Sequence, residues 1–339
     1  MKKIIVTGGL GFIGSNLIDL LIKKNFFIVN VDKVSYSSNF YNLKDYKKSK
    51  KYKFIKCNIA DNKFKNILFK YKPICIFNLA AETHVDRSID NPESFIKKNV
   101  IGTLNLLEAS RKKWLKDTSQ ENNFRFIHVS TDEVYGDLKN KNEYFTEDSK
   151  YMPNSPYSSS KASSDHLVRA WNQTYGLPTI TTNCSNNYGP FQFPEKLIPL
   201  MIINCLDWKP LPIYGDGQNV RDWLHVFDHC SAIKKVYKSG SVYNTYNIGG
   251  NNEIKNIDIV HTICDILNDV KPSENGDYKK LIKFVDDRPG HDFRYAIDSS
   301  KIQKNLGWKP KESFKSGIKQ TVDWYIENEN WWKTIQEKK

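Results

Sequence analysis

The chain has 339 residues, which suits one large domain or two domains that share a core. Hydrophobic residues make up 39% of it and charged residues 26%, a balance typical of folded globular proteins that excludes disordered, collagen-like and disulfide-scaffold chains. The net charge of +13 comes from lysines scattered through the chain, so we expect no nucleic-acid-binding surface, and no apolar run approaches the roughly 18 residues of a membrane span.

The first half of the chain alternates predicted strands and helices. Continuous apolar runs at 3–7, 26–32, 74–80 and 124–130 are typical of buried strands, and helical periodicity follows at 17–22 and most clearly at 95–113. This alternation predicts an α/β fold with a doubly wound parallel sheet covered by helices on both faces. The second half is less regular, and 269–280 has the composition of an exposed loop.

The cysteines and the N-terminus indicate where the protein works. None of the six cysteines forms a CxxC pair or a Cys/His cluster, so we expect buried, reduced thiols and no metal site. The apolar run after Met1 stops at Gly8, which is too short for a secretion signal. We therefore expect a cytoplasmic protein. The cysteines are Cys57, Cys75, Cys184, Cys205, Cys230 and Cys264.

A glycine-rich turn follows the first predicted strand. Residues 9–14 match GxGxxG and open a predicted helix, and Gly8, Gly11 and Gly14 recur at intervals of three. Glycines in this place let the backbone approach a diphosphate at the helix N-terminus. Asp32 ends the second strand, where a carboxylate accepts hydrogen bonds from an adenosine ribose and repels a 2′-phosphate, so NAD is favoured over NADP; Lys33 weakens that preference. The alternative is a glycine turn without a ligand.

Tyr157 and Lys161 lie one turn apart at the start of a predicted helix, which opens at Tyr157 after Pro156 and runs to about Tyr175. A neighbouring ammonium and a positive nicotinamide ring would lower the pKa of the phenol, which could then take a proton from a sugar hydroxyl. The same spacing also arises by chance in surface Tyr/Lys pairs. The glycine turn favours the functional interpretation.

Asp132 and Glu133 follow the strand that ends at Ser130, where an open α/β sheet places its ligands. One interpretation is a solvated acidic turn that caps the next helix. The other is an acid and a base for elimination: oxidation at C4 of a hexose acidifies the C5 proton, one carboxylate removes it, and a protonated carboxyl releases the C6 hydroxyl as water. A 4-epimerase needs no such pair.

Residues 7–14, together with Tyr157 and Lys161, resemble the motifs of the extended short-chain dehydrogenase/reductases, and this resemblance covers nearly the whole chain. The Thr131-Asp132-Glu133 triplet is similar to that of the nucleotide-sugar 4,6-dehydratases. The resemblance implies a Rossmann-type NAD-binding domain at 1–180 and a smaller α/β nucleotide-sugar-binding domain at 181–339, with part of 222–250 returning to the first sheet. It implies dehydration of dTDP-glucose to dTDP-4-keto-6-deoxyglucose. GDP-mannose, CDP-glucose and UDP-sugars remain alternative substrates.

The resemblance also implies the role of each residue. Asp132 is the acid at the C6 hydroxyl, Glu133 the base at C5 and Tyr157 the base at the C4 hydroxyl. Thr131 holds that hydroxyl, and Lys161 binds the nicotinamide ribose. The NAD site comprises Gly8, Gly11, Phe12, Ile13, Gly14, Asp32, Lys33, Val34, Ser35, Asn58, Ile59, Leu79, Ala80, Ala81, Thr83, Tyr157, Lys161 and Asn187. The substrate site comprises Thr83, Thr131, Asn186, Lys196, Leu197, Pro212, Ile213, Tyr214, Arg221, Asn256, Arg288 and His291.

Only seven of the 51 basic residues are arginines, which makes Arg221 and Arg288 candidates for a diphosphate clamp; surface salt bridges are the alternative. The chain departs from the family pattern at Asn58, Thr83 and Gln192, and at Lys98, which we leave out of the site. The resemblance further implies a homodimer packed through the helices near 103–113 and 157–175. From another class, a non-catalytic NAD sensor or a nucleic-acid-binding Rossmann protein would be free to lose the tyrosine, the lysine and the carboxylate pair, all of which are present.

Overall fold

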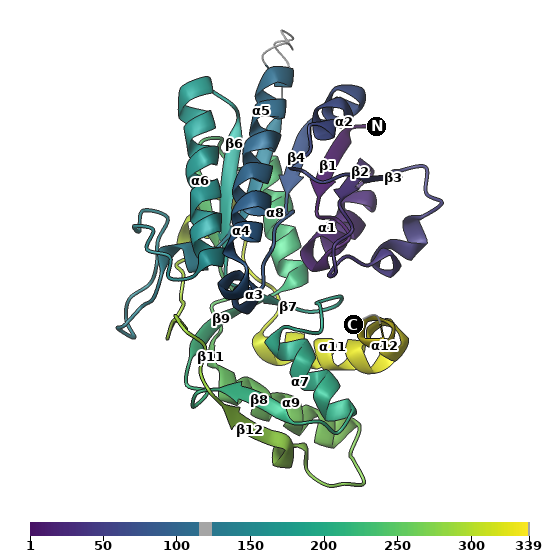
Figure 1. Ribbon diagram of the computed structural model, residues 1–339, viewed down its shortest axis with the longest axis vertical. Coiled ribbons are helices and arrows are strands. Elements are labelled where there is room, and N and C mark those ends of the chain that lie inside the picture. Colours follow the sequence, from purple (N-terminus) through teal and green to yellow (C-terminus); the bar gives the residue numbers. More distant parts are fainter. Residues whose placement is uncertain (115–123, 338–339) are drawn as a thin grey trace.

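The computed structural model describes residues 1–114 and 124–337 (Figure 1). Its centre is a seven-stranded sheet with the order β10-β6-β5-β4-β1-β2-β3, in which every neighbouring pair is parallel. The strands are β1 (Lys3–Thr7), β2 (Phe27–Asp32), β3 (Tyr52–Lys56), β4 (Cys75–Asn78), β5 (Arg125–Thr131), β6 (Thr179–Cys184) and β10 (Thr245–Ile248). This sheet confirms the predicted doubly wound α/β fold, and β10 brings a strand from the second half of the chain to its edge.

Alternate residues of the sheet pack against helices on opposite faces, because successive side chains of a strand point to opposite sides. Ile4 and Val6 join the core formed with α1 (Phe12–Ile22), α8 (Val226–Ser239) and α10 (Ser300–Leu306). Ile5 joins the core formed with α2 (Lys63–Tyr71), α5 (Gly102–Trp114) and α6 (Pro156–Tyr175). The carboxyl ends of the strands remain uncovered by these helices.

A second group of elements lies beyond those carboxyl ends (Figure 1). It contains a three-stranded sheet of β7 (Asn186–Tyr188), β9 (Val220–His225) and β11 (Glu253–Lys255), and a parallel pair of β8 (Leu211–Tyr214) and β12 (Ile282–Val285). Four helices form its core, in which Tyr325 and Trp332 are fully buried. They are α7 (Leu197–Leu206), α9 (Asn256–Val270), α11 (Phe314–Glu327) and α12 (Glu329–Gln336).

Short helical segments complete the fold. They are α3 (Val85–Asp90), α4 (Pro92–Phe95), the π-helical η2 (Ile96–Ile101) and the 3-10 segments η1 (Phe40–Tyr46), η3 (Asp132–Tyr135) and η4 (Tyr278–Leu281). The single helix predicted at 95–113 is therefore interrupted by a π-helical turn before α5. The predicted loop at 269–280 contains the start of η4. All six cysteines are buried and unpaired, as predicted, and within the described ranges no helix is long and apolar enough to cross a membrane.

Candidate active site

A cavity of about 290 Å³ opens at the carboxyl ends of the central strands. It includes the ends of β1 and β2 and of β4, β5 and β6, so it spans the point where the strand order reverses, the usual ligand site of an open α/β sheet. It brings together most of the predicted site. The predicted residues that line it are Gly8, Gly11, Phe12, Ile13, Gly14, Asp32, Lys33, Ser35, Asn58, Ile59, Leu79, Ala80, Ala81, Thr83, Thr131, Asp132, Glu133, Tyr157, Lys161, Asn186, Asn187 and Lys196.

The glycine turn lies between β1 and α1. Gly8 has a φ of +69°, and a Cβ there would lie 2.9 Å from Ala80 Cα. A Cβ on Gly14 would lie 2.8 Å from Gly9 Cα, so both positions require glycine. Gly11 precedes α1 without a side-chain cap, which leaves the first N–H groups of the helix available to an anion.

The Asp32 carboxylate holds the loop that follows β2. It accepts hydrogen bonds from Leu10 N at 3.1 Å, Val34 N at 2.8 Å and Ser38 Oγ at 2.9 Å. Val34 has a φ of 64°, a strained conformation for a β-branched residue, and strain of this kind is often found at functional sites. Val34 was predicted in the site, but the structure places it in this loop and not in the cavity wall.

Lys98 lines the cavity, although its departure from the family pattern predicted a place outside the site. Its ammonium lies 3.0 Å from Glu82 Oε1, and the ammonium of Lys33 lies 2.6 Å from the same oxygen. These two cations hold the pKa of Glu82 below its ordinary value, although burial opposes them. Lys98 reaches the cavity from the π-helical turn, which no sequence pattern indicated.

The two adjacent carboxyls at the end of β5 have different surroundings. Asp132 is 1% exposed; burial, then Glu133 and Asp222, raise its pKa well above the ordinary value. Burial also raises the pKa of Glu133, but Arg288, Lys196 and Arg221 favour its charged form. Two carboxyls whose surroundings differ in this way can serve as a neutral acid and a charged base.

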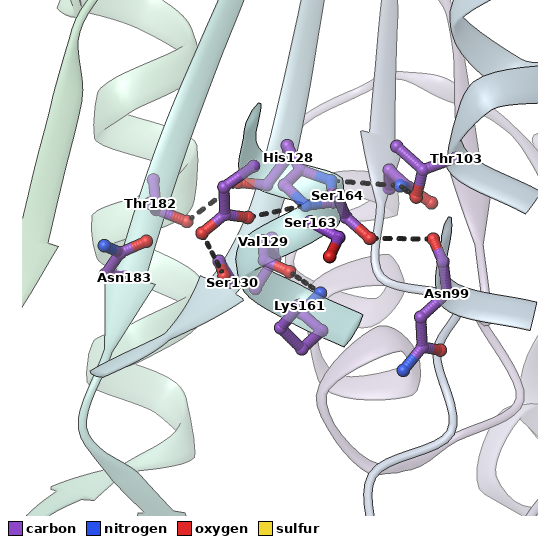
Figure 2. Close-up of polar contacts among 12 residues, drawn as sticks. Asn99, Thr103, His128, Val129, Ser130, Lys161, Ser163, Ser164, Thr182 and Asn183 are labelled. Atoms are coloured by element: carbon purple, nitrogen blue, oxygen red, sulfur yellow. Dashed lines mark hydrogen bonds and ion pairs between the residues drawn. The ribbon is translucent and has the colours of Figure 1, made fainter. Parts of the chain in front are cut away.

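Tyr157 and Lys161 face the cavity from the start of α6, where Ser155 and Ser158 form a capping box. Lys161 Nζ donates to Val129 O at 2.8 Å (Figure 2). Burial and then Glu133 raise the pKa of Tyr157 well above its ordinary value, although a hydrogen bond with Thr131 lowers it. The direction is opposite to the predicted lowering, because the protein buries the phenol and places a carboxylate beside it.

The remaining predicted substrate residues lie outside the cavity wall: Leu197, Pro212, Ile213, Tyr214, Arg221, Asn256, Arg288 and His291. Arg288 NH1 is 3.4 Å from Asp86 Oδ1, and Tyr214 OH donates to Asp86 Oδ2 at 3.2 Å. Arg221 is buried and donates to backbone carbonyls, including Asp292 O at 2.7 Å. Both arginines nevertheless act on the charge of Glu133, so this group adjoins the carboxylate pair.

Several residues at the cavity mouth were not predicted. Glu195 lines the cavity and follows β7. It accepts hydrogen bonds from Tyr36 OH at 2.8 Å, in the loop after β2, and from Arg87 NH2 at 3.0 Å, on α3. Lys196 Nζ donates to Thr83 O at 2.8 Å across the same gap. The further lining residues are Val31, Ser37, Ser38, Cys57, Lys98, Val129, Ser130, Cys184, Ser185, Gln192 and Phe193.

Comparison with known proteins identifies the family. The family model described as GDP-mannose 4,6 dehydratase matches residues 5–321. A dTDP-glucose 4,6-dehydratase of Neisseria meningitidis serogroup B is 53% identical over 341 residues, which cover 99% of this chain and 96% of the relative. The chain belongs to the dTDP-glucose 4,6-dehydratase family.

Two solved dTDP-glucose 4,6-dehydratases share the fold. The enzyme from Bacillus anthracis, in complex with NAD, has a TM-score of 0.87 at 46% identity and covers 99% of this chain and 100% of its own. The enzyme from Streptomyces venezuelae, with NAD and TYD bound, has a TM-score of 0.90 at 39% identity and covers 98% of this chain and 99% of its own. The carboxylate pair and the Tyr/Lys pair, which line the cavity, are therefore the residues to consider for the chemistry of this family.

Proposed function

We propose that this protein is an NAD-dependent dTDP-glucose 4,6-dehydratase that converts dTDP-glucose to dTDP-4-keto-6-deoxyglucose and water. The observation that carries the proposal is one cavity lined by Asp132, Glu133 and Tyr157, with a glycine turn at its other end. The names of the relatives, at about half identity over nearly the full chain, support the choice of substrate.

The cavity fits NAD. The glycine turn presents free N–H groups of α1 for a diphosphate, and Asp32 lies at the end of β2, where an adenosine ribose would bind. Bound NAD would supply the redox chemistry, by removing hydride from C4 of the sugar and returning it at C6. The residues that hold it would be those around the glycine turn, Asp32, Asn58 and Lys161.

The protein's own residues handle the protons. Tyr157, hydrogen-bonded to Thr131, takes the proton of the C4 hydroxyl. Glu133, kept available as a base by the nearby cations, removes the proton at C5, which the 4-ketone has acidified. Asp132 keeps its proton at neutral pH because it is buried beside Glu133, and it donates that proton to the C6 hydroxyl, which leaves as water. Asp132 Oδ2 has no partner within the protein, as expected of a group reserved for a ligand.

We further propose that the nucleotide sugar lies between the cavity and the group formed by Tyr214, Arg221 and Arg288. Two unpartnered buried atoms, Arg288 Nε and Asn256 Oδ1, support this placement, because buried polar groups ordinarily have partners. Arg221, already engaged with backbone carbonyls, would act by its charge. The homodimer through α5 and α6, and a cytoplasmic location, belong to the same proposal; Ile96 and Ile101, 46% and 45% exposed beside α5, offer apolar area for the contact.

The proposed activity is tested by incubating the purified protein with dTDP-glucose and no added NAD. We expect the 4-keto-6-deoxy product to form, detected by its absorbance in base and by mass spectrometry. GDP-mannose, CDP-glucose and UDP-glucose in parallel reactions test the base preference, and we expect turnover at least about tenfold slower with each. Formation of a C4 epimer, or no reaction with any of the four, would contradict the proposal.

The cofactor site is tested by Gly11→Ala. The nearest atom to the added methyl is the backbone Gly8 O at 3.3 Å, a tight contact that a shift of a few tenths of an ångström would relieve, and the methyl would occupy the approach to the diphosphate. We expect a nearly unchanged melting temperature and NAD affinity reduced about tenfold or more, measured by calorimetry. Gly307→Ala, outside the cavity wall, is the control: its φ of +63° makes an alanine strained, so it should lower the melting temperature but leave NAD affinity unchanged. Normal NAD affinity of Gly11→Ala would contradict the proposed diphosphate site at the glycine turn.

A further inference from the structure

A buried carboxylate, that of Asp165, lies one helical turn after Lys161 on α6. Asp165 comes four residues later, on the same face of α6, and is 5% exposed. It accepts hydrogen bonds from Ser130 Oγ at 2.8 Å and Tyr151 OH at 3.1 Å, and its other oxygen lies 3.0 Å from His128 Nε2. Because every one of these neighbours is a donor or can be one, a charged carboxylate is well accommodated here.

The protonation of His128 follows from its neighbours. Asn78 accepts from Thr7 Oγ1 at 2.8 Å through Oδ1, so its Nδ2 is the atom that donates to His128 Nδ1 at 3.1 Å. The proton of the neutral ring is therefore on Nε2, the nitrogen that lies 3.0 Å from Asp165 Oδ1. Burial lowers the pKa of His128, and Lys161 lowers it further, so the ring is neutral at pH 7. His128 therefore carries no positive charge that would offset a negative charge on Asp165.

The buried ammonium of Lys161 needs a negative charge nearby to stay protonated. It is 5% exposed, and its ammonium donates to Val129 O, at the base of the site (Figure 2). A buried ammonium tends to lose its proton unless an opposite charge lies near. The ionisable groups facing it are Asp165 on its own helix, Cys184 on β6, His128 on β5 and Tyr157 one turn earlier. Cys184 keeps its thiol proton because burial raises its pKa strongly, which leaves Asp165 as the anion of this set.

We propose that Asp165 is a positioning residue, whose buried carboxylate, one helical turn after Lys161, keeps the Lys161 ammonium charged; Ser130, Tyr151 and His128 hold Asp165 in place. Asp165 itself does not line the cavity, so it acts only through Lys161. The inference rests on the proposed function, because it assigns to Lys161 a charge that the reaction requires. It also explains why the polar side chains of His128 and Ser130 on β5 are buried against α6 (Figure 2).

The test is the titration of Lys161 in the holoprotein. Lysine labelled with ¹³C at Cε gives one NMR signal that is missing from Lys161→Met, and its pH dependence reports the Lys161 charge. In Asp165→Asn, we expect the midpoint to fall by about one to two pH units, from the loss of one nearby charge. The alkaline limb of kcat should move down by the same amount, with KM changed less than about twofold. Asp165→Glu should restore part of the shift.

Ser130→Ala is the matched control, because it removes one hydrogen bond to Asp165 but leaves the charge, and its Lys161 midpoint should stay within about half a unit of wild type. An Asp165→Asn protein with a wild-type Lys161 midpoint would overturn the proposal. If that variant does not fold, the wild-type titration decides: a neutral Lys161 at pH 7 overturns the proposal, and a charged one supports it. The titration does not need turnover, so loss of the proposed activity and loss of this inference are separate outcomes.

Discussion

Glu133→Gln should abolish dehydration, with turnover reduced about a hundredfold to ten-thousandfold, while NAD and the nucleotide sugar still bind. The glutamine side chain has the same size and shape as that of glutamate, but its amide cannot accept the C5 proton. The measurement is product formation from dTDP-glucose, combined with deuterium incorporation at C5 in heavy water. We expect both to be lost together, because the same base starts both processes.

Glu327→Gln is a matched control, since it makes the same chemical change on an exposed position of α11 away from the cavity. It should have wild-type turnover. A Glu133→Gln protein that still incorporates deuterium at C5 would show that another group is the base. The Asp132 carboxyl is the only neighbour on the same turn that could take this role, and its raised pKa argues against it.

The same substitution should stabilise the fold. Burial raises the pKa of Glu133 above its unfolded value, so the folded state binds more protons than the unfolded state at pH values between the two. The free energy of unfolding therefore falls as pH rises through that window, and the charged side chain destabilises the protein at pH 7. Replacing it with a neutral amide should raise the free energy of unfolding by about 1 kcal/mol, as found for other active-site charges.

The chemistry at the strand ends could be predicted because it depends on short sequence spacing. The three glycines at 8, 11 and 14 lie in one turn, and the Tyr157/Lys161 pair lies on one helix. The alternation of apolar runs shows that the glycine turn follows the first predicted strand. The parallel sheet then brings those ends to one edge, as the cavity shows. Local pattern and sheet topology together were enough for the core of the site.

Contacts between distant segments could not be predicted in this way. Lys98 lines the cavity from within η2, whose π-helical geometry no local sequence pattern indicated. Glu195 joins loops that are more than a hundred residues apart in the chain, through Arg87 and Tyr36. β3 was missed because the charged side chains of Lys53 and Lys56 interrupt the apolar pattern at an exposed sheet edge.

The charge state of Tyr157 shows a further limit of sequence reasoning. The i,i+4 spacing indicated a phenol beside an ammonium, but it gave no sign of how deeply the ring is buried or how near Glu133 lies. Those two effects dominate in the protein alone. Lowering of the phenol pKa during the reaction therefore has to come from bound ligands and from the charge on Lys161, and this makes the tyrosine and the network behind the lysine one functional unit.

Tyr157→Phe should reduce turnover about a hundredfold to ten-thousandfold with little loss of NAD or substrate affinity. Only the hydroxyl is removed, and the ring keeps its edge contact with Phe95 at 6.3 Å between centroids. In the wild type, turnover should rise with pH on the acid side as the phenol loses its proton, because bound ligands and the charge on Lys161 lower the phenol pKa that burial raises in the protein alone. In the variant, that rise should disappear, leaving a pH profile set by the carboxylate pair.

Tyr246→Phe is the control, because it removes a buried hydroxyl that accepts from Ser241 N at the far edge of the sheet and should leave the pH profile unchanged. A Tyr157→Phe profile parallel to that of the wild type would assign the acid-side rise to another group. Deuterium at C4 of the substrate separates the two cases further. Slowed C4 oxidation in Tyr157→Phe should make turnover sensitive to that label, whereas loss of a later step, as in Glu133→Gln, should not.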